Sequence, residues 1–157
     1  MFRYCVFIVI WMCSSQLFAL DANEWTLDIN TGSKHSSETY GKNKYYNEEN
    51  NGFGMTFGYS DMIDIKIGFF DNSYNKSSVY GGAVFNKDYY IFNDIVVSPG
   101  VGLMFTTGYH DTPIDAPALA PIVYPTITIG HKTLRSTIGY VPYGEDTVFT
   151  FQTQIQF

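Results

Sequence analysis

The sequence predicts an all-β protein, namely an eight-stranded antiparallel up-and-down transmembrane β-barrel preceded by a cleaved signal peptide. Three observations lead to this prediction. The first twenty residues have the make-up of a secretory signal. The rest of the chain alternates apolar and polar side chains with a period of two, as strands do. Aromatic residues make up 18% of the chain and charged residues only 15%, which is unusual for a soluble domain.

A signal peptide is expected over residues 1–20. Arg3 supplies the positive charge at its start, and Val6–Met12 forms a short apolar centre. Small residues then indicate cleavage near Ala19 or Ala22. The alternative is a transmembrane helix, but the apolar stretch falls short of the roughly 20 residues that a spanning helix needs.

Both cysteines of the chain, Cys5 and Cys13, lie inside this segment. A lipoprotein anchor at Cys13 is a further alternative, but bulky Trp11 and Met12 precede it where small residues are expected. After cleavage no cysteine remains, which excludes disulfides, a thiolate nucleophile and a cysteine-based metal site. Residues 21–157 are expected to form one barrel domain.

The period of two is clearest in four segments, Gly52–Tyr59, Met62–Phe69, Ile95–Thr107 and Thr147–Phe157. Each has one apolar face and one face rich in Gly, Thr, Gln or charge. No long apolar run follows the signal, which excludes helical membrane spans. The net charge of −6 argues against a nucleic-acid partner, which requires a basic surface.

A secreted β-sandwich would also alternate, and three features favour the membrane barrel over it. Several strands reach about ten residues, the length that crosses a bilayer when tilted. The polar faces carry glycine, glutamine and the charges of Asp64 and Lys66, as a small barrel lumen does. The chain ends on Phe157, an aromatic terminus typical of outer-membrane barrels.

Eight strands are expected, at Trp25–Gly32, Gly52–Ser60, Met62–Phe70, Ser78–Tyr90, Ile95–Gly108, Ala118–Gly130, Thr133–Val141 and Thr147–Phe157. The connections at 60–61, 92–94 and 131–132 are tight, whereas those at 33–51, 71–77, 109–117 and 142–146 are longer or more polar. Outer-membrane barrels have short periplasmic turns and long external loops, so the second set is expected outside the cell. An eight-stranded barrel holds side chains or one small ligand and is not a porin.

The external rim is where chemistry is expected. His35 in the first external loop and Ser73 in the second would share this rim, so the imidazole could activate the hydroxyl. The plainer alternatives are a solvated surface histidine and an ordinary polar turn. His110 lies in the third external loop and His131 in a periplasmic turn. The chain contains no Gly-x-Ser-x-Gly elbow, no phosphate-binding glycine loop and no metal-ligand spacing, so neither a metal nor a cofactor is expected.

Several short motifs occur in a characteristic order. Tyr46-Asn47-Glu48 precedes the glycine-rich Gly52-Phe53-Gly54, and Asn72-Ser73-Tyr74-Asn75-Lys76 follows. A proline-spaced segment at 116–125, Tyr140-Val141-Pro142 and the aromatic terminus complete the set. Over nearly the whole mature chain, this order resembles the lipid A palmitoyltransferase family, PagP.

The resemblance implies an enzyme that moves an acyl chain, palmitoyl or shorter, from a phospholipid to lipid A. Its partners would be these two lipids, and it would act as a monomer in the outer membrane. The catalytic residues it implies are His35, Asn72 and Ser73. The substrate-binding residues it implies are Gly82 and Val84 beside the acyl pocket, where Val84 would limit its depth, and Pro121 and Pro125 where lipid passes between strands. Prolines lack the N–H that a strand ladder needs, although they could equally shape only a loop and an edge-like strand.

One departure from the family concerns charge. Asn72 stands where the family has aspartate, and an amide cannot provide the anion that orients and stabilises a charged imidazole. On this argument Asn72→Asp should raise activity. Two other functions remain open: a non-enzymatic barrel that binds through its loops and, less favoured for lack of a His-x-Ser motif, a lipid A deacylase.

Overall fold

The computed structural model describes residues 25–91, 95–114, 116–131, 133–143 and 146–157. The expected signal peptide and its cleavage site lie outside these residues. Every regular element described is a strand: β1 (Trp25–His35), β2 (Thr39–Gly41), β3 (Lys44–Tyr45), β4 (Gly52–Ser60), β5 (Ile63–Asp71), β6 (Ser77–Asn86), β7 (Tyr89–Ile91), β8 (Ile95–Thr106), β9 (Ala120–His131), β10 (Leu134–Tyr143) and β11 (Asp146–Gln156). Over the same residues, no helix has the length and apolar character to cross a membrane.

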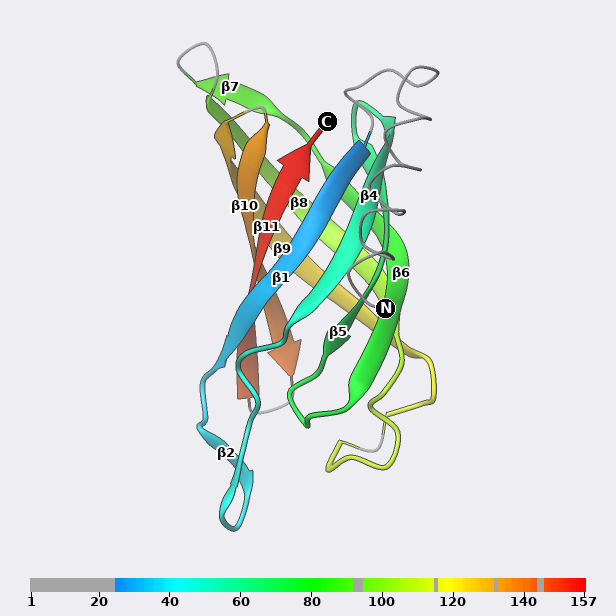
Figure 1. Cartoon of the computed structure of the whole chain (residues 1–157), viewed down its shortest axis with the longest axis vertical. Coiled ribbons are helices and arrows are strands. Elements are labelled where there is room, and N and C mark those ends of the chain that lie inside the picture. Colours follow the sequence, from blue (N-terminus) through cyan, green and yellow to red (C-terminus); the bar gives the residue numbers. More distant parts are fainter. Residues whose placement is uncertain (1–24, 92–94, 115, 132, 144–145) are drawn as a thin grey trace, which may run out of the picture.

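Eight of the strands form a closed ring (Figure 1). Neighbours run in the order β6, β5, β4, β1, β11, β10, β9, β8, and β6 pairs with β8 to close the circle. All pairs are antiparallel. The prediction of an eight-stranded antiparallel barrel is therefore confirmed, and the sandwich alternative is excluded because a sandwich keeps two separate sheets.

The predicted strand at 78–90 is wrong in one respect, because it is broken in two. β6 ends at Asn86, and β7 pairs with the start of β8 outside the closed ring. The Asp88 carboxylate accepts hydrogen bonds from Ser98 at 2.5 Å and from Arg135 at 3.1 Å. These interior partners hold Asp88 at the end of the lumen, so the chain leaves the barrel wall there.

Strand β1 is longer than predicted, and a glycine bulge explains the difference. The register against β11 shifts between Asn30 and Gly32, after which pairing continues as far as His35 opposite Val148. Gly32 has φ of 149°, and a Cβ there would lie 2.8 Å from the carbonyl oxygen of Glu48. Only glycine fits both constraints. His35 is consequently the last residue of a strand and not part of a loop.

The two faces of the wall differ as predicted. Large apolar side chains are exposed on the outside, among them Phe53, Ile65, Ile67, Phe69, Val79, Leu103, Val123, Ile129 and Phe149. The buried residues of the interior are mainly polar, including Asp28, Thr56, Lys66, Ser98, Thr126 and Gln154. This is the reverse of a soluble protein, in which apolar side chains occupy the core.

A buried charge pair organises the interior. Asp28 is fully buried, and its carboxylate lies 3.5 Å from the Lys66 ammonium. The same carboxylate accepts hydrogen bonds from Thr56 at 2.6 Å and Gln154 at 3.0 Å. Lys66 also donates to Gln152 at 2.7 Å. Such a pair is stable inside a barrel because the remaining donors and acceptors are satisfied.

The long connections gather at one end of the barrel. The β2–β3 hairpin and the segments at 107–114 and 116–119 lie at the lower end in Figure 1, opposite β7 and the C-terminus. The Asn47 N–H donates to the Ser73 carbonyl at 2.8 Å, and Lys76 donates to the His110 carbonyl at 3.0 Å. The prediction that the first and second external connections share a rim is confirmed.

Candidate functional site

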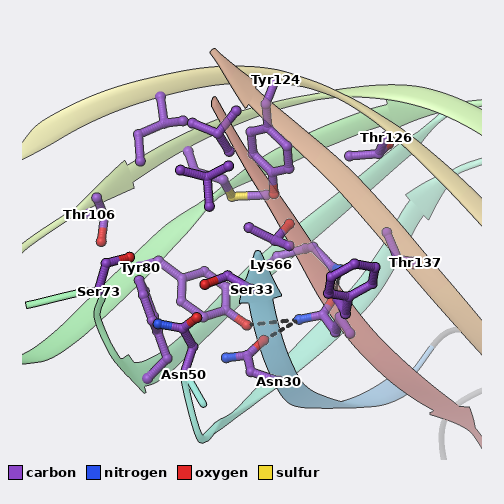
Figure 2. A pocket seen from close by; sticks show the side chains of 18 of the residues that line it. Asn30, Ser33, Asn50, Lys66, Ser73, Tyr80, Thr106, Tyr124, Thr126 and Thr137 are labelled. Atoms are coloured by element: carbon purple, nitrogen blue, oxygen red, sulfur yellow. Dashed lines mark hydrogen bonds between the residues drawn. The ribbon is translucent and has the colours of Figure 1, made fainter. Parts of the chain in front are cut away.

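A cavity of about 430 Å³ occupies the lumen and reaches the rim. His35 and Ser73 line its rim end, whereas Lys66 and Arg135 line its polar depth. The phenol rings of Tyr80 and Tyr124 project into it between these ends, and Tyr80 is tied to Gln152 and Asn30 by a short hydrogen-bond chain (Figure 2). The two residues that the sequence selected for His–Ser chemistry therefore line one cavity.

His35 is held rigidly at the rim. Its side chain is only 3% exposed, and its ring stacks on that of Tyr46 with centroids 4.0 Å apart and planes 5° apart. The Glu48 carboxylate accepts the His35 backbone N–H at 3.1 Å, and the same oxygen lies 3.8 Å from Nδ1. Nδ1 is buried and makes no hydrogen bond within the described part of the chain.

Ser73 belongs to the tight turn between β5 and β6 and is 8% exposed. Asn47 ties this turn to the first loop, because its backbone N–H donates to the Ser73 carbonyl and its side-chain amide to the Asn72 carbonyl at 3.2 Å. Among the described residues no hydrogen bond links the His35 ring to the Ser73 hydroxyl. Catalytic hydrogen bonds often form only once substrate is bound.

Asn72 is fully buried but is not among the residues that line the cavity. Its side-chain amide donates to the Ser78 hydroxyl at 3.0 Å and to the Gly108 carbonyl at 2.9 Å. Its side-chain oxygen accepts the backbone N–H groups of Tyr74 and Lys76, at 2.9 and 3.1 Å. Asn72 therefore organises the turn that presents Ser73, using both donors and acceptor of its amide.

This geometry reverses the effect expected of Asn72→Asp. Aspartate could not donate to the Gly108 carbonyl and would place a negative charge against it. We expect a loss of about 1–3 kcal/mol of stability and no gain of activity. The measurement is the temperature at which the folded, faster-migrating band is lost on unboiled gels. Asn75→Asp is the matched control, since Asn75 is exposed at φ 58°, a conformation that aspartate also tolerates. Equal transition temperatures for the two variants would contradict the assignment.

The four residues implied as substrate-binding fall in different places. Val84 is buried and lines the cavity, and Pro121 also lines it. Gly82 and Pro125 are not among the lining residues. A Cβ at Gly82 would lie 2.1 Å from the Leu103 carbonyl oxygen and 2.9 Å from the Met104 sulfur, so only glycine allows β6 and β8 to lie this close here. The Met104 side chain next to Gly82 lines the cavity.

The ladder between β9 and β10 stops partway. It runs from His131 opposite Leu134 to Thr126 opposite Gly139. Residues 120–125 of β9 pair only with β8. Residues 140–143 of β10 pair only with β11. Proline cannot donate to a ladder, so the interruption begins at a residue that the sequence had singled out.

The cavity extends to this interruption. Pro121 and Val123 of β9 and Val141 and Pro142 of β10 belong to its lining. Val123 is 59% exposed on the outer surface, although it also borders the cavity. The cavity lining therefore includes residues of both strands along the stretch where β9 and β10 do not pair.

The other histidines lie outside the cavity, and both are exposed. The described residues contain no group of three histidine, cysteine or acidic side chains suited to a metal ion. Sequence reasoning missed the ring stacking at His35 and the wider cluster formed by Tyr40, Tyr46, Tyr74 and Tyr109. Tyr40 lies in the short hairpin strand β2 and the other three in loops, where side chains follow no regular period, so no sequence signal marked them as partners.

A closed ring of eight antiparallel strands with an apolar outer surface and a polar interior defines a transmembrane β-barrel, and this protein is one. Among solved structures it is similar to the outer membrane protein Ail of Yersinia pestis, studied in a phospholipid bilayer nanodisc. The likeness has a TM-score of 0.45 and 8% sequence identity, and it covers 85% of this chain and 99% of Ail. No protein-family profile and no curated protein matches the sequence.

The lipid-facing belt leads to a stability prediction. Ile67 stands at the middle of β5 and is 62% exposed. Ile67→Arg should destabilise the barrel in lipid by about 2–4 kcal/mol, because a charge at the membrane midplane loses its hydration. Tyr59→Arg, next to the last residue of β4, should cost only about 0–1 kcal/mol. Equilibrium unfolding by denaturant in lipid vesicles measures both, and equal costs would contradict the membrane placement.

Proposed function

We propose that this barrel takes up an acyl chain of an outer-membrane phospholipid and transfers it to lipid A, with His35 and Ser73 as the reacting pair. The observation that carries the proposal is that these two side chains, one at the end of β1 and the other in the connection between β5 and β6, line one lumen cavity at the rim. The order of motifs that resembles the PagP family supports the same reaction.

The interrupted β9–β10 ladder supports a route for the acyl chain. A phospholipid tail lies in the hydrocarbon layer, and a gap bordered by Pro121, Val123 and Pro142 would admit it sideways without exposing it to water. Apolar side chains such as Val84 and Met104 would contact the chain inside the lumen. In this proposal the buried polar network around Asp28 and Lys66 limits how deep the chain can go.

The proposed chemistry is transfer of an acyl group between two oxygens. Nδ1 of His35 faces Glu48, which leaves Nε2 to remove a proton from the attacking hydroxyl. That hydroxyl is either Ser73 or that of lipid A itself, with Ser73 polarising the carbonyl. The ester bond to the phospholipid glycerol breaks, and the imidazolium returns its proton to that oxygen. If Ser73 attacks first, it forms an acyl-serine; the lipid A hydroxyl then attacks this ester, gives its proton to His35, and the Ser73 oxygen leaves and takes that proton back. No metal or cofactor is needed.

A non-enzymatic barrel is the second candidate. Neutral Asn72 in place of the family's aspartate favours it, because the turn residue next to Ser73 then contributes structure and no charge. In that case the cavity would hold an acyl chain without transferring it, and the external loops would bind a partner.

Purified protein in mixed micelles of acyl-labelled phospholipid and lipid A separates the candidates. Label in lipid A with release of lysophospholipid is the expected result. Label in free fatty acid alone would indicate a hydrolase, and bound but unconverted phospholipid would indicate the non-enzymatic barrel. N-terminal sequencing of the same preparation tests the proposed removal of residues 1–20.

A further inference from the structure

We infer that two carboxylates, Glu48 in the loop between β3 and β4 and Asp146 at the start of β11, supply the negative charge beside His35 that Asn72 cannot supply. The role of this pair in catalysis rests on the proposed function. The positions of the two carboxylates are given by their contacts, since Glu48 Oε1 lies 3.8 Å from Nδ1 of His35 and Asp146 accepts hydrogen bonds from Ser36 and Ser37, the two residues after His35.

The first carboxylate belongs to the loop between β3 and β4. Glu48 Oε1 lies 3.8 Å from Nδ1 of His35, which is close enough for an ion pair but too long for a hydrogen bond. Its own backbone carbonyl accepts the Ser33 N–H at 2.8 Å, which fixes the loop against the bulge at Gly32. The His35 backbone N–H, more than any other group, holds the pKa of the Glu48 carboxyl below its usual value. Glu48 is therefore ionised at neutral pH.

The second carboxylate begins β11, the strand that pairs with the end of β1. Asp146 accepts hydrogen bonds from the Ser36 hydroxyl and from the Ser37 and Thr147 backbone N–H groups, the last two at 3.0 and 3.2 Å. The Tyr46 hydroxyl donates to it as well. Because the Tyr46 ring stacks on His35, Asp146 both orients the ring that holds the imidazole and adds negative charge near it.

One cation opposes the pair. Lys34 lies beside Glu48, with Nζ 3.0 Å from Oε2, and the charged groups that act on His35 are Asp146, Glu48 and Lys34. Lys34 is 60% exposed and water screens it, whereas Glu48 Oε1 approaches a buried nitrogen that has no other described hydrogen-bond partner. Burial of the ring is the largest influence and lowers the pKa of His35, whereas the two carboxylates act against it and favour the protonated imidazole, the form that a general base adopts in the transition state.

The Tyr46-Asn47-Glu48 motif thereby gains a physical account. Tyr46 stacks on His35, Asn47 holds the Ser73 turn, and Glu48 faces Nδ1. Three consecutive residues thus join the two halves of the candidate site.

The test is the pKa of the His35 imidazole, measured by NMR on histidine-labelled protein in lipid nanodiscs. His110→Gln and His131→Gln are introduced first, which leaves His35 as the one imidazole signal of the chain. Glu48→Gln/Asp146→Asn removes both charges but keeps an oxygen to accept the hydrogen bonds. We expect this variant to lower the pKa of His35 by at least about one pH unit, since an opposite charge within about 4–6 Å shifts a pKa by 1–3.

Glu49→Gln is the matched control, because Glu49 is the adjacent exposed carboxylate and its removal changes the net charge in the same sense. Persistence of the folded band on unboiled gels confirms that each barrel is intact. A His35 pKa in the double variant equal to that of the control would overturn the inference. The pKa measurement needs no turnover. The inference about Glu48 and Asp146 can therefore be refuted even if acyl transfer is observed, and supported even if no transfer is observed.

Discussion

His35→Ala and Ser73→Ala should each abolish detectable acyl transfer while the barrel still folds. A positioned general base contributes about 10²–10⁴-fold to a rate, and the loss of the hydroxyl removes either the nucleophile or the group that polarises the ester. The measurement is labelled acyl chain appearing in lipid A, with purified protein in mixed micelles.

His110→Ala is the control for this prediction. His110 is an exposed histidine of the third external connection and is not among the cavity-lining residues. It should transfer at the wild-type rate. If His35→Ala retained more than a tenth of wild-type activity, the imidazole would not be the base and the proposed chemistry would be wrong.

Lys66→Met should destabilise the barrel by about 3–5 kcal/mol, because it leaves the fully buried Asp28 carboxylate without its cation. Methionine keeps most of the length and volume of the lysine stem, so the loss reports charge more than packing. Denaturant unfolding in lipid vesicles gives the free-energy difference.

The double variant Asp28→Asn/Lys66→Met measures the interaction between the two side chains apart from the contacts that each makes with other residues. Asparagine retains an oxygen for Thr56 or Gln154 and removes the unpaired charge. The double variant should therefore be more stable than Lys66→Met alone, giving a coupling energy of the kind expected for contacting residues. A double variant as unstable as the sum of both single variants would show that the two charges do not interact.

The strands were predictable because their signal is strong and local. In β5, Ile65 and Ile67 face outward and Lys66 faces inward. Because side chains alternate between the two faces, placing the isoleucines toward lipid also places Lys66 in the lumen. The break after Asn86 was not predictable. It depends on Asp88 meeting Ser98 and Arg135, residues that the sequence alone does not bring together.

The candidate site was predictable only in part, because side-chain direction in a turn has no periodicity. Alternation of connections was sufficient to place His35 and Ser73 on one rim. The direction of the Asn72 amide, toward Gly108 and away from the cavity, follows from backbone hydrogen bonds within the turn. The nearness of Glu48 to His35 depends on the bulge at Gly32, a single-residue shift that strand patterning does not reveal.

Mass spectrometry of lipid A from Gram-negative cells with and without this protein tests the central claim most directly. Such cells should produce wild-type protein, Ser73→Ala or no protein at matched amounts in the outer membrane. The account predicts a lipid A species heavier by one acyl chain with wild type only. Identical lipid A from all three, with folded barrel present in the membrane, would contradict acyl transfer and leave the non-enzymatic barrel.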